Sequence, residues 1–312
     1  GLDSISNTAG GSISASGNLI LAGNVLNNAS GSMGAAGALQ ITATTLTNDQ
    51  GQLLGNQGVL LQTGLLSNRD QGQIGSANSS VRIDSGTVTN RGGRIVAQTA
   101  AALDSQSLDN SAGQISGDTV AIDTHAQQLT NSAGRIASTG GATTIASGAL
   151  DNRGGAIQSA TTLTLDTQSQ NLDNSQSGTL AGVGQVTITT AELHNTGGLI
   201  QAGGTLQATA EAAARTVESD LQIHASGALQ NEQGTVQASR DLTVTARSLD
   251  NSQGALQAAH TLSATAAQAL TNTGGQIIAN EAVHLSSDSL SNDVQGQIGS
   301  ANSSVRIDSG TV

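Results

Sequence analysis

A short motif built around asparagine recurs along the whole chain. An aliphatic residue, a polar residue and Asn follow one another fourteen times, and successive motif asparagines lie 20 to 22 residues apart, except for one interval of 36 residues. A fixed period of this length predicts a repeat architecture built from one short unit. The motif asparagines are Asn7, Asn28, Asn48, Asn68, Asn90, Asn110, Asn131, Asn152, Asn174, Asn195, Asn231, Asn251, Asn272 and Asn292.

The residues around each Asn follow the consensus L-x-L-x-A-x-x-L-x-N-x-x-G-x-I-x-A. Apolar positions alternate with a period of two, which indicates β-strands and not helices. Each unit holds three such segments, and each is too short to pair within its own unit. Pairing in parallel with the copy in the next unit gives an all-β, parallel β-solenoid. We therefore expect three short strands per coil, about 21 residues per coil and about 15 coils.

The composition agrees with a small aliphatic core that is repeated in every coil. The chain of 312 residues has no aromatic residue, although aromatic side chains normally dominate large globular cores. It also has no Pro, as expected if nearly every backbone N–H donates to a neighbouring coil. A Gly follows each motif Asn by three or four residues, and we expect it to allow a positive φ at a corner.

The motif Asn has the same alternation parity as the inward aliphatic residue before it. Its amide is therefore expected to point inward, where it needs hydrogen-bond partners. A stack of identical amides supplies these partners, since each carbonyl accepts from the N–H of the adjacent coil. We predict a structural Asn ladder at the fourteen motif positions.

Two irregularities interrupt the pattern. The 36-residue interval from Asn195 to Asn231 is predicted to hold a degenerate, shortened coil region at 196–230, within a single repeat array of residues 1–312. Residues 211–220 lack the motif, and they are interpreted as a small surface bulge or, alternatively, a functional loop. The string QGQIGSANSSVRIDSGTV occurs at 71–88 and again at 295–312. Because the chain begins and ends within the pattern, we expect it to be part of a longer protein.

Composition excludes several functional classes. The net charge is −12, and no aromatic residue can stack on a base, so no nucleic-acid binding is expected. No apolar run reaches the length of a membrane span. The absence of Cys excludes thiol catalysis and cysteine-bound metal.

No residue pattern indicates catalysis, a cofactor or a metal. The five histidines are expected to be solvated surface residues, because none has the spacing of a metal-binding pair; they are His125, His194, His224, His260 and His284. Asp151 and Asp173 lie in adjacent coils and could hold a cation between them, but an Asp beside a turn is the simpler interpretation. Asp109 and Asp250 occupy the same motif position. Coils of nearly constant length leave no room for the long loops of β-helical polysaccharide lyases, so an enzyme is not expected.

The repeats resemble those of a known family. Segments such as ALQITATTLTNDQGQLLG (38–55) and SLDNSAGQIS (107–116) are similar to the haemagglutinin repeats of filamentous haemagglutinin and of other two-partner-secretion exoproteins. The resemblance covers essentially the whole chain and weakens only near 211–220. It implies a right-handed parallel β-helix, export through an outer-membrane secretion partner, and a location in the secreted fraction or on the surface of a Gram-negative bacterium. The family's secretion domain carries Asn-Pro motifs, so a chain without Pro is expected to lack that domain.

The function that this resemblance implies is that of a structural shaft. The shaft would belong to a large secreted filamentous adhesin that mediates attachment to host cells. Two alternatives remain open: the stalk of a contact-dependent growth-inhibition effector, and a shaft that itself binds host-cell glycans or receptors. The outward Ser, Thr, Gln, Asp and Asn residues suit sugars, but they are equally what solubility requires.

Overall fold

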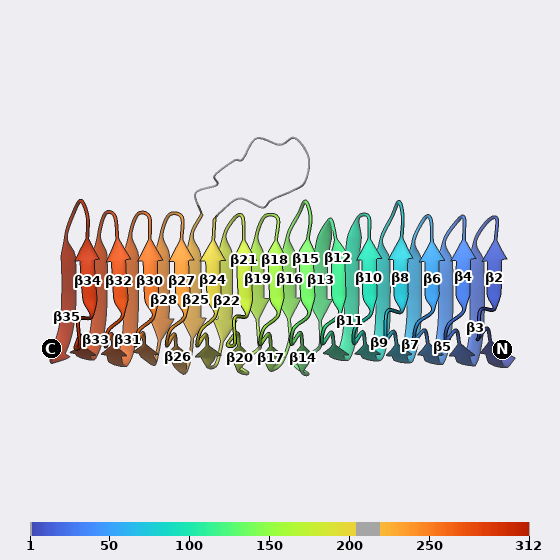
Figure 1. The fold of residues 1–312 in the computed structure, drawn as a ribbon, viewed down its shortest axis with the longest axis horizontal. Helices are drawn as coiled ribbons and strands as arrows, with labels where there is room; N and C mark the ends of the chain where they lie inside the picture. Colours follow the sequence, from blue (N-terminus) through green and yellow to red (C-terminus); the bar gives the residue numbers. More distant parts are fainter. Residues whose placement is uncertain (1, 204–218, 312) are drawn as a thin grey trace. The chain divides into compact units, whose positions relative to one another are not determined.

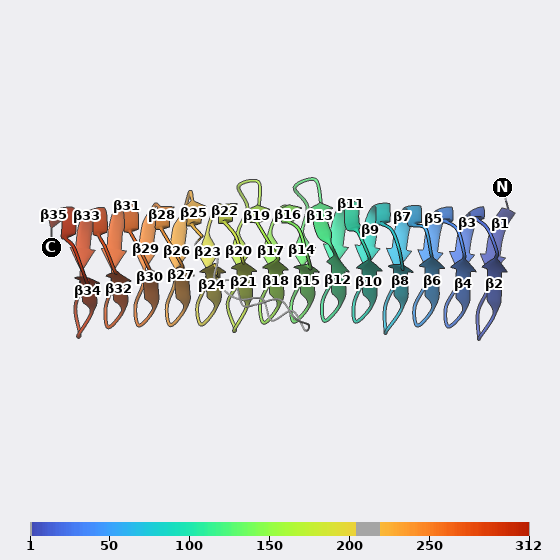
Figure 2. The ribbon, with the colours of Figure 1, turned by 90° about the horizontal axis from the view of Figure 1, so that it is seen from above.

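The computed structural model describes residues 2–203 and 219–311, which contain strands and turns but no helix, and hence no helix that could span a membrane. The residues group into two compact units, Gly1–Ala149 and Leu150–Val312. Within each unit, every strand pairs in parallel with its counterpart in the neighbouring coil (Figures 1 and 2). The predicted all-β parallel β-solenoid is confirmed.

One sheet takes a four-residue strand from every coil, formed by the segment that follows the motif Gly. The first unit contributes β2 (Ser12–Ala15), β4 (Ser32–Ala35), β6 (Gln52–Gly55), β8 (Gln73–Ser76), β10 (Arg94–Ala97), β12 (Gln114–Gly117) and β15 (Arg135–Ser138). The second unit contributes β18 (Ala156–Ser159), β21 (Thr179–Gly182), β24 (Leu199–Ala202), β27 (Thr235–Ala238), β30 (Ala255–Ala258), β32 (Gln276–Ala279) and β34 (Gln297–Ser300). We call this the Gly-x-Ile sheet.

The remaining strands form the other two sides of each coil. In some coils the Leu-x-Leu-x-Ala run and the Leu-x-Asn step join into one long strand, and in others they are separate. The first unit has β1 (Leu2–Ser6), β3 (Leu19–Asn27), β5 (Leu39–Thr47), β7 (Val59–Ser67), β9 (Val81–Thr89), β11 (Ala100–Asp109), β13 (Thr119–Asp123), β14 (Leu129–Thr130) and β16 (Thr143–Ala146). The second has β17 (Leu150–Asp151), β19 (Leu163–Asp166), β20 (Leu172–Asp173), β22 (Val186–Thr190), β23 (Leu193–His194), β25 (Leu221–Ala225), β26 (Ala228–Gln230), β28 (Leu242–Ala246), β29 (Ser248–Asp250), β31 (Leu262–Thr271), β33 (Val283–Ser291) and β35 (Val305–Thr311).

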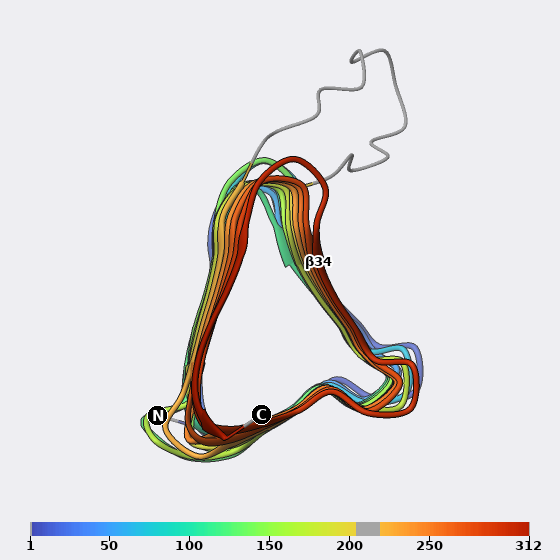
Figure 3. The same ribbon diagram turned by 90° about the vertical axis from the view of Figure 1, so that its left-hand side faces the viewer.

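Each coil is three-sided in cross-section (Figure 3). The core consists of columns of buried aliphatic side chains inside the coils. In one coil, Leu39, Ile41, Leu46 and Leu53 are all fully buried, while Gln40 and its outward neighbours reach solvent. Burying each such side chain contributes about 1.5–3 kcal/mol. Strand pairing in register places each aliphatic residue next to its counterpart in the adjacent coil, for example Leu39 beside Val59. The alternation in the sequence therefore becomes a continuous column of apolar contacts.

The motif Gly is required for a different reason from the one predicted. The positive φ in the corner belongs to the residue before it, such as Gln50 (57°) or Gly92 (64°). Gly51 itself has no positive φ, but a Cβ atom on it would overlap with the backbone oxygen of Asn28 in the preceding coil. The expectation that this Gly supplies the positive φ is wrong, because the constraint is the close approach of two backbones.

The number of coils is fourteen and not about fifteen, since the Gly-x-Ile sheet has one strand per coil and fourteen strands. The difference comes from the 36-residue interval, which forms one coil. On its two sides, Ala202 pairs with Gly182, and Leu221 pairs with Val186. The extra residues therefore enter at the corner between β24 and β25. Of segment 211–220, only Ser219 and Asp220 are among the described residues.

This register predicts that residues 204–218 can be removed without loss of the fold. Joining Gly203 to Ser219 leaves three residues between Ala202 and Leu221, as many as separate Gly182 from Val186. We expect the variant to retain a strand-type circular dichroism spectrum and a melting midpoint within about 3 °C of the parent chain.

A deletion of equal length that removes core strands provides the control. Removing residues 235–249 takes away β27 and β28, and it should abolish cooperative unfolding. Loss of cooperative unfolding in the 204–218 deletion would show that these residues are part of the coil.

Candidate functional site

The motif asparagines of each unit are joined by hydrogen bonds between their amides. In the first unit, Nδ2 of each Asn donates to Oδ1 of the Asn one coil later at 2.7 Å, from Asn7 to Asn131. In the second unit, the same bonds run from Asn152 to Asn292 at 2.7–2.8 Å. The first thirteen asparagines are buried, and Asn292 is exposed. We call each row an Asn column.

The local sequence explains why this amide faces inward. Asn48 follows the buried Leu46 by two residues at the end of β5, so both side chains point into the coil. Besides its bond to the next Asn, the Asn48 amide lies 3.2 Å from the backbone oxygen of Gly51 and 3.0 Å from that of Gln73. One side chain thus binds its own corner and the corner of the next coil. A neutral amide held in this way is suited to structure and not to acid–base or nucleophilic chemistry.

The aspartates that precede a motif Asn interact with nearby protein groups. Asp109 accepts a hydrogen bond from the backbone N–H of Ser111 at 2.9 Å, and so caps the turn. The guanidinium of Arg153 lies 2.7 Å from Asp151 and 3.8 Å from Asp173. Hydrogen bonding to Arg153 lowers the pKa of Asp151, and burial opposes this effect. The positive charge beside Asp151 and Asp173, which the sequence analysis considered as a cation-binding pair and set aside, is therefore the side chain of Arg153.

The histidines lie on the surface, and three of them lie beside acidic side chains. His125 Nε2 is 2.6 Å from Asp104 Oδ1, and this hydrogen bond, with the charge of Asp123, raises the pKa of His125. His194 lies 3.5 Å from Glu192, and His260 lies 2.9 Å from Asp241. His224 and His284 are exposed. Within the described parts of the chain, no three His, Asp or Glu side chains are grouped closely enough to hold a metal ion.

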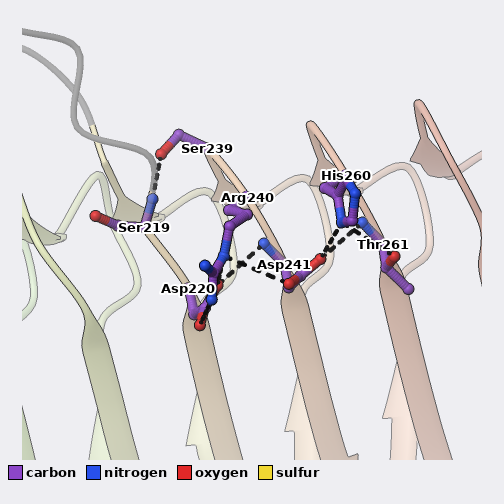
Figure 4. Close-up of polar contacts among 7 residues, drawn as sticks. All are labelled: Ser219, Asp220, Ser239, Arg240, Asp241, His260 and Thr261. Carbon is purple, nitrogen blue, oxygen red and sulfur yellow. Dashed lines mark hydrogen bonds and ion pairs between the residues drawn. The ribbon is translucent and has the colours of Figure 1, made fainter.

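A row of polar side chains crosses three successive coils at the corner that precedes β25, β28 and β31 (Figure 4). The guanidinium of Arg240 binds Asp220 in the preceding coil, with Nε 2.6 Å from Oδ1, and it also lies 3.5 Å from Asp241. Asp241 in turn accepts from the backbone N–H of Thr261 at 3.0 Å. Hydrogen bonding to Arg240 lowers the pKa of Asp220, against a smaller opposing effect of burial.

No motif in the sequence predicts this row. These residues lie at the corner before a strand, where alternation does not assign a face, and their proximity depends on the register across the 36-residue interval. Asp220 lies beside Arg240 because β25 pairs with β28 immediately after the inserted segment. The row links Asp220, directly before β25, to the next coil, and the backbone N–H of Ser219 donates to Ser239 Oγ at 2.9 Å.

Comparison with known proteins identifies the repeat. A family model described as haemagglutinin repeat matches residues 2–86, 75–133, 121–175, 165–233 and 237–311. These overlapping matches leave only a few residues of the chain uncovered. Neither a functionally characterised protein nor a solved structure matches it.

The Asn column yields a prediction about stability. Asn90→Ala removes the acceptor of Asn68 Nδ2 and the donor to Asn110 Oδ1, both in a buried corner. We expect this substitution to lower the free energy of unfolding by about 1–3 kcal/mol, as measured in denaturant melts. Asn292→Ala at the exposed end is the control and should cost less. Equal, negligible effects of both substitutions would contradict a stabilising role for the column.

The Arg240–Asp220 pair yields a prediction about pH. Arg240→Gln should raise the pKa of Asp220 towards its ordinary value, as measured by a carbon NMR titration of the carboxyl group. Because the folded-state pKa lies below the unfolded-state value, the pair stabilises the protein above the unfolded-state pKa, and this contribution is lost as pH falls through the folded-state pKa. Melting midpoints of variant and parent should differ at neutral pH and converge in strong acid. The exposed Arg247→Gln is the control, and an unchanged Asp220 titration would contradict the assignment.

Proposed function

Because this chain belongs to the haemagglutinin-repeat family, we propose that it forms part of the shaft of a large secreted bacterial adhesin. The observation that carries the proposal is the extent of the family match, which covers almost every coil of the chain. In this proposal, residues 1–312 act as one repeat array that holds more distal binding segments away from the cell. The adhesin would attach the bacterium to host cells.

The surface of the coils supports a structural role. Outward positions carry mostly polar residues, such as Gln40 and Thr42 on β5, whereas the inward positions are aliphatic. The family that the repeat identifies is one of structural and adhesive proteins. The polar surface and the family match therefore favour a scaffold over a catalyst.

The proposal includes a route to the surface. An outer-membrane secretion partner would export the parent protein of a Gram-negative bacterium, and the coils would fold as they emerge. Stacking needs only the preceding coil as a template, because each strand pairs with its counterpart one coil away. This route requires no contact with nucleic acid and no membrane-spanning segment in these residues.

The test uses the producing bacterium. Antibodies raised against the purified chain should label intact cells, and deleting the secretion partner should abolish the label. Deleting the array in frame, with the distal segments retained, should reduce attachment to epithelial cells several-fold. An antibody to a periplasmic protein controls for leakage of the outer membrane.

Two other outcomes would contradict the proposal of an adhesin shaft. Labelling only after permeabilisation would contradict surface exposure. Normal attachment together with a lost ability to inhibit neighbouring bacteria in co-culture would assign the array to a growth-inhibition stalk instead.

A further inference from the structure

A hollow of about 610 Å³ lies on the outer face of the Gly-x-Ile sheet in the first unit. Its lining comes from five neighbouring strands, β2, β4, β6, β8 and β10 (Figure 1). Because neighbouring strands lie about 4.8 Å apart, the hollow extends roughly 19 Å across these strands. Its volume and length are those of a site for a small, elongated ligand.

An exposed aliphatic side chain stands at the centre of the hollow. Leu54 on β6 is 41% exposed, because its neighbours in the two adjacent coils are Gly34 and Gly75, which have no side chain to cover it. Val96 continues the row on β10, and Ala36, directly after β4, adds a further apolar wall. The floor is therefore mostly aliphatic and open to solvent.

The two glycines are not required by the backbone of the coil. Neither Gly34 nor Gly75 has a positive φ. A Cβ atom on Gly34 would meet nothing within 4 Å, and one on Gly75 would lie 3.4 Å from Leu54 Cδ2, which is an ordinary contact. Gly51, in contrast, has the backbone of the preceding coil where its Cβ would be. Because glycine weakens a strand, its presence without a steric need often marks the close approach of a ligand.

A positive charge lies at one end of the hollow. Arg94 on β10 lines it beside Gln73 of the preceding coil. Other arginines, such as Arg82 and Arg153, bind an aspartate. Among the residues that the structure describes, no carboxylate lies within ion-pair distance of Arg94. None of the fourteen Gly-x-Ile strands contains Asp or Glu, so the acids that give the chain its net charge of −12 lie outside this sheet.

These features restrict what could bind. An aliphatic floor favours an apolar chain, because covering it removes apolar surface from water. The guanidinium of Arg94 favours an anionic head group at one end. The backbone of β6 is already paired with β4 and β8, so a peptide strand could not add main-chain bonds there. The ligand that meets these conditions is an unbranched aliphatic chain with a terminal anion.

We propose that the hollow binds the carboxylate form of a long-chain fatty acid. The alkyl chain would lie against Leu54 over Gly34 and Gly75, and the carboxylate would accept hydrogen bonds from the guanidinium of Arg94. One acyl chain reaches about 15 Å, half the hydrocarbon core of a bilayer, and so fits the length of the hollow. This binding role goes beyond that of a shaft and does not depend on it.

Ligands that share a tail but differ in the head group test the proposal on the intact chain. Decanoate, decan-1-ol and decyltrimethylammonium are titrated below the concentrations at which they form micelles. The readout is the NMR signals of the Gly34 and Gly75 amides and of the Leu54 methyl groups. Decanoate should shift all of these signals and bind about three- to five-fold more tightly than the alcohol, as expected for an exposed ion pair. The cationic ligand should bind most weakly, and each methylene added to the tail of decanoate should tighten binding about two- to four-fold.

Substitutions in the hollow decide the assignment. Gly34→Leu and Gly75→Leu should each abolish the shifts, because the new side chain covers the floor. Ala181→Leu, at the equivalent outward position on β21, is the matched control. Arg94→Gln should remove the preference for decanoate over decan-1-ol and leave the affinity for the alcohol unchanged. Arg135→Gln is its control, since Arg135 follows Arg94 by two coils in the same row but does not line the hollow.

Several results would overturn the proposal. These are no shift with decanoate, equal affinities for decanoate and decan-1-ol, and shifts that persist in a Gly34→Leu/Gly75→Leu double variant whose fold is confirmed by circular dichroism. Binding to phosphatidylglycerol vesicles without binding to dispersed decanoate would also overturn it, and would assign this face to a membrane surface instead. None of these results bears on the shaft role, which is tested by attachment of whole cells.

Discussion

The polar groups inside each coil depend on the neighbouring coil for their partners. The Asn column shows this dependence most clearly, because a buried amide costs about 1–3 kcal/mol if it is left without a hydrogen bond. Asn48 satisfies its amide only if Asn28 and Asn68 occupy the same corner one coil away. That geometry brings the backbones of adjacent coils so close that only glycine fits after the turn, as at Gly51. The Leu-x-Asn-x-x-Gly motif is thus one constraint repeated along the chain.

The same constraint explains where the chain tolerates variation. The chain is longer than in other coils between β24 and β25, whereas the Asn column runs along the corner that leads into the Gly-x-Ile sheet. The two flanks remain bonded to the preceding coil, through Gly203 N to Gly182 O at 2.9 Å and Ser219 Oγ to Val183 O at 3.0 Å. Extra residues at this corner leave the bond from Asn195 to Asn231 intact at 2.7 Å. The added chain length between Gly203 and Ser219 therefore leaves the Asn column and the flanking backbone bonds intact.

The sequence indicates those features that depend only on one coil and its period. Alternation around Leu46 and Asn48 gives the inward orientation and the strand type, and a constant interval gives parallel stacking. Features that depend on contacts between two coils cannot be predicted from the sequence pattern of one coil. The count of fifteen coils failed because the length of an interval does not show whether it closes one turn or two. The contact of Arg240 with Asp220, and the exposure of Leu54 beside Gly75, likewise required the register between strands.

A direct test of the central claim is to observe the amide–amide hydrogen bonds in solution. Scalar couplings across hydrogen bonds connect a donor nitrogen with the carbonyl carbon that accepts from it. A long-range HNCO experiment on the intact chain should correlate Asn90 Nδ2 with the Cγ of Asn110, and it should give the same pattern for the other asparagines of each column. Their side-chain N–H groups should also exchange slowly with solvent. Absent correlations, together with side-chain exchange as fast as that of the exposed Gln52, would contradict the account.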